Sequence, residues 1–201
     1  MKREPLRLIL GRMDSPIGQV LTATDADGVL RALDFHDYED RLRRLLIRHY
    51  GAVELLEGEA PERVRAALQA WFAGDLRAFD GLSITTGGTE FQRRVWAALR
   101  DIPAGETRSY GQLAAAIGQP TAVRAVGLAN GANPVGIVTP CHRVIGAGGA
   151  LTRGLEAEIV QLENFERSEG RRAGAMIGAR ARHQRPHGVL AGNDAIALGL
   201  L

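Results

Sequence analysis

The only cysteine of the chain, Cys141, lies in the stretch TPCHRVIG at residues 139–146 and is the first candidate for chemistry. Pro140 restricts the backbone before it, and His142 and Arg143 follow directly. A histidine can take the proton of a thiol, and a nearby cation lowers the pKa of a thiol and raises its thiolate fraction. A lone cysteine is more commonly a buried, inert side chain. The residue types alone therefore do not decide whether the Cys141 thiol is inert or reactive.

A second candidate is the stretch TAVRAVGLANGA at residues 121–132, which predicts a helix with Thr121 as its N-cap. Most of its residues are small, and Arg124 is its one long charged side chain. The small residues include Ala122, Ala125 and Gly127. This pattern indicates either close helix packing or close approach to a nucleic-acid backbone. A major-groove reader needs several polar side chains, so the second reading favours a sequence-tolerant minor-groove binder that inserts one side chain.

The elements that must position these residues begin with an α/β pattern. Short runs rich in branched residues predict strands at 6–10, 19–24 and 29–35, separated by turn sequences. Apolar residues at helical spacing predict helices at 37–50 and 61–73. We therefore expect residues 1–88 to form an α/β domain that ends in a glycine-bearing linker at 74–88.

Residues 89–132 are predicted to be mostly helical. The capping-box spacing occurs at Thr89–Gln92 and again at Ser109–Gln112, and the second of these helices, a short turn and the helix after Thr121 form a helix-turn-helix pattern. A turn at Asn133 and a short apolar strand at 135–139 then lead to the cysteine. We expect a mostly α domain at 89–169 and predict a disordered tail at 170–201, because the tail has no sustained periodicity.

Composition excludes several classes of protein. The net charge of +2 and the absence of a basic arm leave DNA affinity to a few placed arginines. No apolar run is long enough for a membrane helix, and the first residues lack the pattern of a signal peptide. One cysteine fits a reducing compartment. We expect a cytoplasmic monomer that does not contact membranes.

Three motifs in register resemble one family. GETRSYGQLA, RAVGLANGANP and PCHRVIG stand at the spacing of the O6-alkylguanine-DNA alkyltransferases, also called methylated-DNA–protein-cysteine methyltransferases, and the similarity runs without a gap from Thr89 to about Gly149. The upstream DSPIG and LQAWFAGDLRAFD resemble that family's N-terminal domain, which is ribonuclease-H-like. The resemblance implies a nucleoid-associated bacterial repair protein without cofactor or metal. It would flip O6-alkylguanine out of duplex DNA and transfer the alkyl group irreversibly to its own cysteine; O4-alkylthymine is a second candidate lesion.

The resemblance also assigns roles to residues. Cys141 would accept the alkyl group, and His142 would take the thiol proton through a water molecule. Arg124 would fill the gap in the base stack. Tyr110 would crowd the 3′ phosphate and donate to the leaving guanine, and Asn133 would be the hinge between the helix and the cysteine.

The remaining assignments concern the DNA face and the substrate pocket. Thr121, Ala122, Ala125 and Gly127 would join Tyr110 and Arg124 against DNA. Val144 and Arg143 would line the substrate pocket, and Glu166 would orient His142.

After Gly149 the sequence departs from the family. The family's Gly-Tyr/Phe-x-Gly-Gly loop is shortened, with Arg153 and Gly154 in its place, and Glu163 and Glu166 flank the position expected for the glutamate behind the histidine. This departure favours an alternative, an impaired or non-catalytic lesion sensor, which the presence of the cysteine opposes. A Cys-His hydrolase is a third hypothesis. It has no supporting motif around the other histidines, which are His36, His49, His183 and His187.

Overall fold

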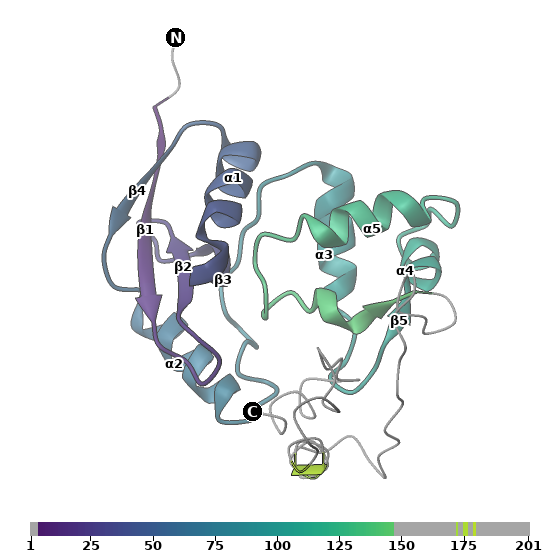
Figure 1. Ribbon diagram of the computed structural model, residues 1–201. Helices are drawn as coiled ribbons and strands as arrows, with labels where there is room; N and C mark the ends of the chain where they lie inside the picture. The colour runs from purple at the N-terminus through teal and green to yellow at the C-terminus, as the bar shows by residue number, and fades with distance from the viewer. Residues whose placement is uncertain (1–3, 147–171, 173–174, 177–178, 180–201) are drawn as a thin grey trace.

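The computed structural model describes residues 4–146, together with Arg172, Ala175, Met176 and Ala179. These residues form a sheet-bearing N-terminal half and a helical C-terminal half, and an extended segment after residue 73 joins them (Figure 1). The predicted disordered tail falls largely outside the described residues, as do Arg153, Glu163 and Glu166.

The N-terminal half is built on a four-stranded sheet with the order β3-β2-β1-β4. Its strands are β1 (Leu6–Met13), β2 (Val20–Thr24), β3 (Leu30–Phe35) and β4 (Val53–Glu57). The first three are antiparallel neighbours and were predicted, whereas β4 runs parallel to β1 and was not. Every residue of β4 is partly or fully exposed. An edge strand of this kind lacks the apolar pattern by which strands are recognised in a sequence.

Helices cover both faces of this sheet. They are α1 (Glu39–Tyr50), which follows the short 3₁₀ turn η1 (His36–Tyr38), and α2 (Glu62–Phe72). Leu42 and Leu46 of α1 pack with Leu21 on one face, and Val64 and Leu68 of α2 pack on the other. Successive strand residues point to opposite faces, so the fully buried β2 contributes to both cores.

An ion-pair network ties the start of α1 to the sheet. Arg12 and Arg43 donate to the carboxylate of Glu39, at 2.9 and 2.6 Å, and hold the pKa of Glu39 at about 2, below its ordinary value of 4.5. A lowered pKa contributes stability that is present above about pH 4.5 and is lost as the pH falls towards 2.

We therefore expect Glu39→Gln to lower the free energy of unfolding at pH 7 by about 1 kcal/mol, the scale of a solvent-accessible network. Urea unfolding of both proteins at a series of pH values measures the gap. The gap should close between pH 4.5 and 2. A gap that stays constant over this range would show that the glutamate acts through packing and not through its charge.

The C-terminal half packs three helices around one core. They are α3 (Glu90–Arg100), α4 (Tyr110–Ala116) and α5 (Val123–Gly131), with the 3₁₀ turn η2 (Cys141–Arg143) and a two-stranded ladder of β5 (Arg108–Ser109) and β6 (Val144–Ile145) beside them. Both predicted capping boxes are confirmed: Thr89 and Gln92 exchange hydrogen bonds at the start of α3, and Ser109 and Gln112 do so at α4. No helix among the described residues is long and apolar enough to cross a membrane.

The structure corrects two predictions about this half. The N-cap of α5 is Ala122 and not Thr121, because Ala122 closes a turn by donating to the carbonyl of Gln119 at 2.9 Å and so starts the helix one residue later. Residues 135–139 do not form a strand: Val135 makes a single β-bridge to Leu33, and residues 136–139 turn away from it. There, Thr139 donates to the carbonyl of Val135 at 3.0 Å, and these local bonds override the β propensity of the branched side chains.

Candidate active site and DNA-binding face

Cys141 opens the 3₁₀ turn η2 and is half-buried. Its N–H donates to the carbonyl of Thr139 at 2.8 Å, and its side chain packs against the core formed by α3, α4 and α5. The thiol is therefore held at the edge of a rigid core and stays partly accessible. This is the environment expected of a presented thiol and not of a fully buried one.

The segment from 133 to 141, which we call the cysteine loop, is organised by the buried side chain of Asn133. Its amide donates to the carbonyl of Thr139 at 2.8 Å, and its carbonyl oxygen accepts from the N–H of Val135 at 3.0 Å. Asn133 is 2% exposed. Between these anchors Ile137 has a φ of 65°, a strained conformation for a β-branched residue. One carboxamide thus pins both ends of a strained turn that leads to the cysteine, as expected for a hinge.

The cysteine loop is also attached to the sheet of the N-terminal half. Leu33 of β3 donates to the carbonyl of Pro134 at 2.9 Å and accepts from the N–H of Gly136 at 3.0 Å. Val135 and Val138 pack into the core between the sheet and α2. The cysteine loop is therefore hydrogen-bonded to the outer edge of β3. The two halves of the molecule also share one buried core, because Val135 and Val138 belong to it.

Arg41 of α1 makes a second link between the halves. Its guanidinium pairs with Asp34 at 2.5 Å and donates to the carbonyls of Gly131 and Asn133, each at 3.0 Å. These two carbonyls lie at the C-terminal end of α5, where backbone carbonyls lack helical partners and the helix dipole favours a cation. Arg41 thus caps α5 from the other half of the molecule, which no local pattern in the sequence indicated.

His49, two turns further along α1, packs at the same boundary. Its ring meets that of Trp96 edge-on at a centroid distance of 5.5 Å. Burial lowers the pKa of His49 below its ordinary value of 6.5, so the ring is neutral at pH 7. His49 lines a hollow of about 480 Å³ together with Leu128, Ala129 and Ala132.

Tyr110, at the first position of α4, lies beside α5. A methyl group built on Gly127 would stand 3.8 Å from the tyrosine ring. The amide of Asn130 reaches both the Tyr110 hydroxyl, at 3.5 Å, and the carbonyl of Cys141, at 3.3 Å. The structure therefore brings the tyrosine and the cysteine together through Asn130. Sequence reasoning missed this residue, although a poor helix former in the last turn of a small-residue helix was a signal for it.

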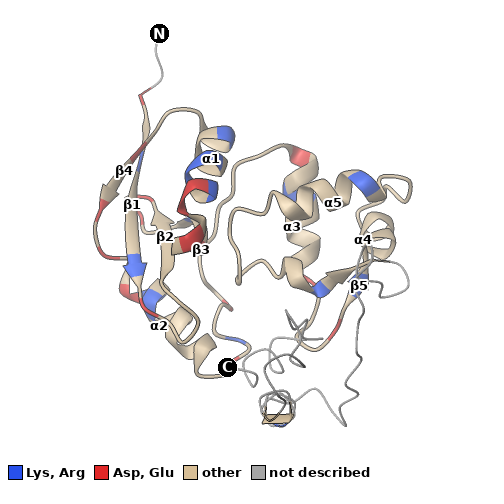
Figure 2. Ribbon diagram, in the orientation of Figure 1, with Lys and Arg blue, Asp and Glu red and all other residues tan. Residues whose placement is uncertain are grey.

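The outer face of α5 carries the predicted DNA-binding residues. Arg124, Ala125 and Thr121 are exposed, and Ala122 and Gly127 are half-exposed. Arg124 is the only charged residue of α4 and α5, and Figure 2 shows one blue segment on α5. The exposed surface of α5 thus consists mainly of small residues, with one cation at Arg124 and the larger apolar side chains of Val123 and Leu128.

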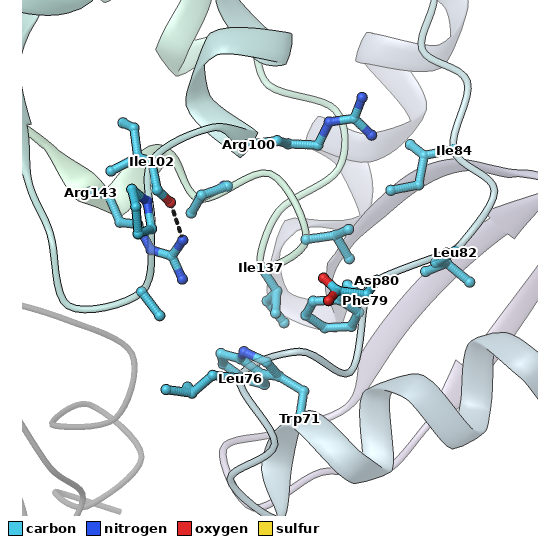
Figure 3. A pocket seen from close by; sticks show the side chains of 15 residues that line it. Trp71, Leu76, Phe79, Asp80, Leu82, Ile84, Arg100, Ile102, Ile137 and Arg143 are labelled. Carbon is cyan, nitrogen blue, oxygen red and sulfur yellow. Dashed lines mark hydrogen bonds between the residues drawn. The ribbon is translucent and has the colours of Figure 1, made fainter.

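Figure 3 shows Arg143 next to Ile102, at one side of a pocket between the two halves. Arg143 is 9% exposed, donates to the carbonyl of Ile102 at 2.6 Å, and lines this cavity of about 320 Å³ together with Trp71, Phe79 and Ile137. This guanidinium thus fastens the turn after the cysteine to the end of α3.

The other predicted site residues have different surroundings. His142 is exposed. Val144 is buried in the helical core and pairs with Arg108 between β6 and β5. The predicted partner of the histidine, Glu166, lies outside the described residues.

Comparison with known sequences identifies the class of protein. The family model for the DNA-binding domain of 6-O-methylguanine DNA methyltransferase matches residues 90–169. The methylated-DNA–protein-cysteine methyltransferase of Salmonella typhimurium is 46% identical over 167 residues, which is 82% of this chain and 97% of the relative. That of Mycolicibacterium paratuberculosis is 49% identical over 143 residues, or 70% of this chain and 79% of the relative.

Solved structures give the same result. The crystal structure of Mycobacterium tuberculosis OGT in complex with DNA matches with a TM-score of 0.60 and 42% identity, over 72% of this chain and 82% of that one. The fold and the presented thiol therefore define a DNA-binding protein that transfers methyl groups. The chain belongs to the family of methylated-DNA–protein-cysteine methyltransferases.

Proposed function

We propose that this protein repairs O6-alkylguanine in duplex DNA by moving the alkyl group to Cys141, once per molecule. The sulfur–carbon bond forms as the bond from carbon to O6 breaks, and the electron pair of that bond stays on guanine. Guanine gains one proton and the thiol loses one, so the protons balance. The product is a thioether, which has no hydrolytic second step to regenerate the thiol. The single observation that carries the proposal is a half-buried thiol, linked to Tyr110 through Asn130, in a chain of this family.

We assign the proton steps to two side chains. His142 follows the thiol and is exposed, so it can take the thiol proton through water. Tyr110 can donate a hydrogen bond to guanine as negative charge develops on it. Asn133 serves as the hinge between α5 and the cysteine. Val144 and Arg143 line the substrate pocket, and Glu166 orients His142.

The DNA face proposed here is α5, with α4 and α5 as a helix-turn-helix. A helix whose exposed positions include small residues such as Ala122, Ala125 and Gly127 can approach the minor groove closely, and Arg124 can enter the base stack when the target base leaves it. Duplex DNA with O6-alkylguanine is the principal substrate, and O4-alkylthymine is a second one. The relatives compared here are all named as methyltransferases, so the lesion-sensor alternative has no support.

We further propose a domain division for this activity. Residues 1–88 form the supporting domain, residues 89–169 form the transferase domain, and the tail begins at 170. The sheet order, with β4 parallel to β1 after the α1 crossover, supports a ribonuclease-H-like reading of the first domain. A DNA substrate and a single free thiol support a monomer that acts in the cytoplasm.

The proposed activity predicts one covalent change. After incubation with a duplex that contains one O6-methylguanine, intact-mass measurement should show a gain of one methylene per protein molecule, and peptide mapping should place it on Cys141. Cys141→Ser should show no gain, because the alcohol lacks a comparably reactive anion at neutral pH. A folded wild-type protein that gains no mass, or gains it on another residue, contradicts the proposal.

The proposed DNA face makes a separate prediction. Ala125→Gln should leave the unfolding free energy within about 0.5 kcal/mol, because the site is exposed and both residues are good helix formers. The longer side chain should hold α5 away from DNA and lower the affinity for duplex by about tenfold, about 1.4 kcal/mol. Fluorescence anisotropy measures the affinity. Ala115→Gln, at an exposed position of α4, is the matched control; equal losses in both variants would argue against α5 as the contact surface.

A further inference from the structure

The side chain of Asn130 connects the two groups to which the proposed reaction assigns chemistry. It lies in the last turn of α5 and is half-buried. Its Nδ2 is 3.3 Å from the carbonyl oxygen of Cys141 and 3.5 Å from the hydroxyl oxygen of Tyr110. One amide group therefore touches the backbone of the acceptor cysteine and the phenol that faces the leaving group.

The orientation of this carboxamide follows from its partners. A backbone carbonyl is only an acceptor, so the NH₂ end of Asn130 must face Cys141. The opposite assignment would place two acceptor oxygens against each other, which settles the choice that the side-chain atoms alone leave open. The same NH₂ group is the one that reaches Tyr110.

This orientation determines which way the tyrosine hydroxyl points. An amide NH₂ is only a donor, so the phenol oxygen accepts from Asn130, and its own proton is left to point elsewhere. A hydroxyl can both accept and donate, and accepting one hydrogen bond strengthens the one it donates. The contact thus prepares Tyr110 as a donor towards a group that arrives outside the protein.

The other end of the carboxamide is held at a cost. Its Oδ1 is buried and has no hydrogen-bond partner among the described residues. An unsatisfied buried acceptor is unfavourable, and an apolar side chain of the same shape would avoid this cost. The two donated hydrogen bonds are therefore what the polar side chain contributes at this position.

We propose that Asn130 is a positioning residue that acts through Tyr110. By donating to the phenol oxygen it directs the tyrosine proton at the guanine that leaves, and its second hydrogen bond, to the Cys141 carbonyl, holds the carboxamide in the orientation that this requires. Asn130 itself touches neither the alkyl group nor the sulfur. This inference rests on the proposed function, and it adds a residue for which the family motifs supplied no role.

A double-mutant cycle tests this inference. The rate constant of methyl transfer from duplex O6-methylguanine is measured in single-turnover reactions with protein in excess, for wild type, Asn130→Leu, Tyr110→Phe and the double variant. Asn130→Leu should slow transfer by about tenfold, less than the 10²–10³ that follows the loss of a transition-state donor outright. The double variant should be no slower than Tyr110→Phe, because the asparagine acts only through the hydroxyl.

Asn130→Asp is the second variant, with nearly the same volume and a reversed polarity. Its carboxylate accepts from Tyr110 and turns the phenol proton inwards, so transfer should be slower than in Asn130→Leu at pH 8 and should recover as the carboxylate is protonated. The carboxylate also faces the Cys141 carbonyl, so Asn130→Asp is combined with Tyr110→Phe; a pH dependence that acts through the hydroxyl should disappear in this double variant. Gln69→Leu, which removes an exposed amide from α2, is the matched control and should transfer at the wild-type rate.

The outcomes separate the two proposals. If wild type gains no methyl group on Cys141, the proposed function fails and this inference fails with it. If wild type transfers and Asn130→Leu keeps its rate, only the inference is overturned. Rate losses that multiply in the double variant also overturn it, because they would show that Asn130 acts independently of Tyr110.

Discussion

Replacing Asn133 with alanine is expected to lower the free energy of unfolding by about 3 kcal/mol, because it removes both hydrogen bonds that close the cysteine loop. The carbonyl of Thr139 and the N–H of Val135 would lose their partners in a region where Asn133 itself is 2% exposed. Each orphaned buried group costs about 1–3 kcal/mol. Among the described residues, the turn at Ile137 is closed at both ends by the carboxamide of Asn133. Without this side chain the loop should also relax.

The same substitution should therefore change the chemistry as well as the stability. With the hinge released, Cys141 no longer has one fixed position beside Tyr110, and we expect methyl transfer to slow by at least about 10²-fold, as when a reacting group is misplaced by about 1 Å. Urea unfolding and single-turnover transfer measure the two effects. Asn133→Asp keeps the acceptor for Val135 but cannot donate to Thr139, and it should fall between wild type and alanine. An alanine variant with wild-type stability would refute the hinge.

Replacing Arg41 with leucine is the second large change. It leaves the carboxylate of Asp34, whose side chain is 13% exposed, without its guanidinium, and it uncaps the carbonyls of Gly131 and Asn133. Breaking a buried ion pair costs about 3–5 kcal/mol, and this pair is only partly buried, so we expect a loss of about 2–3 kcal/mol. Because the cap holds the end of α5, the affinity for duplex DNA should fall by about tenfold.

Two variants make the Arg41 prediction specific. Arg41→Lys keeps the charge but not the planar fork that reaches Asp34 and two carbonyls together, so it should recover only part of the stability. Arg44→Leu, at an exposed position of the same helix, removes an equal charge and should have little effect on either measurement. If the Arg41 and Arg44 variants lose DNA affinity equally, the loss comes from the net charge and not from the cap.

Elements specified by nearby residues were predictable from the sequence. The strands β1, β2 and β3 and both helices of the N-terminal half follow apolar periodicity. The capping boxes at Thr89 and Ser109 depend on residues three positions apart, so they can be read from a short window. Cys141 and Arg124 stood out as the only cysteine of the chain and the one long charged side chain of a small-residue helix, whereas the role of Tyr110 came from the resemblance to a known family.

Contacts between distant residues were not predictable in this way. The edge strand β4 has no buried pattern of its own, and the branched residues after Pro134 form turns because β3 and Asn133 supply their hydrogen bonds. The cap that Arg41 makes on α5 joins residues about ninety positions apart. Any exposed-looking arginine of α1 was an equal candidate for that role in the sequence.

The reactive residues of this protein are thus specified by its sequence, whereas the contacts that position them depend on its tertiary structure. Short motifs in the linear sequence identify the nucleophile, the small-residue helix that bears Arg124 and the family. Folding decides how accessible the thiol is and which way the Tyr110 proton points. It also decides that the N-terminal half holds the cysteine loop and the end of α5 through Leu33 and Arg41. Hydrogen bonds have directions and lengths of about 3 Å, and only the packed chain brings Arg41, Asn130 and Asn133 within that distance of the backbone that carries Cys141.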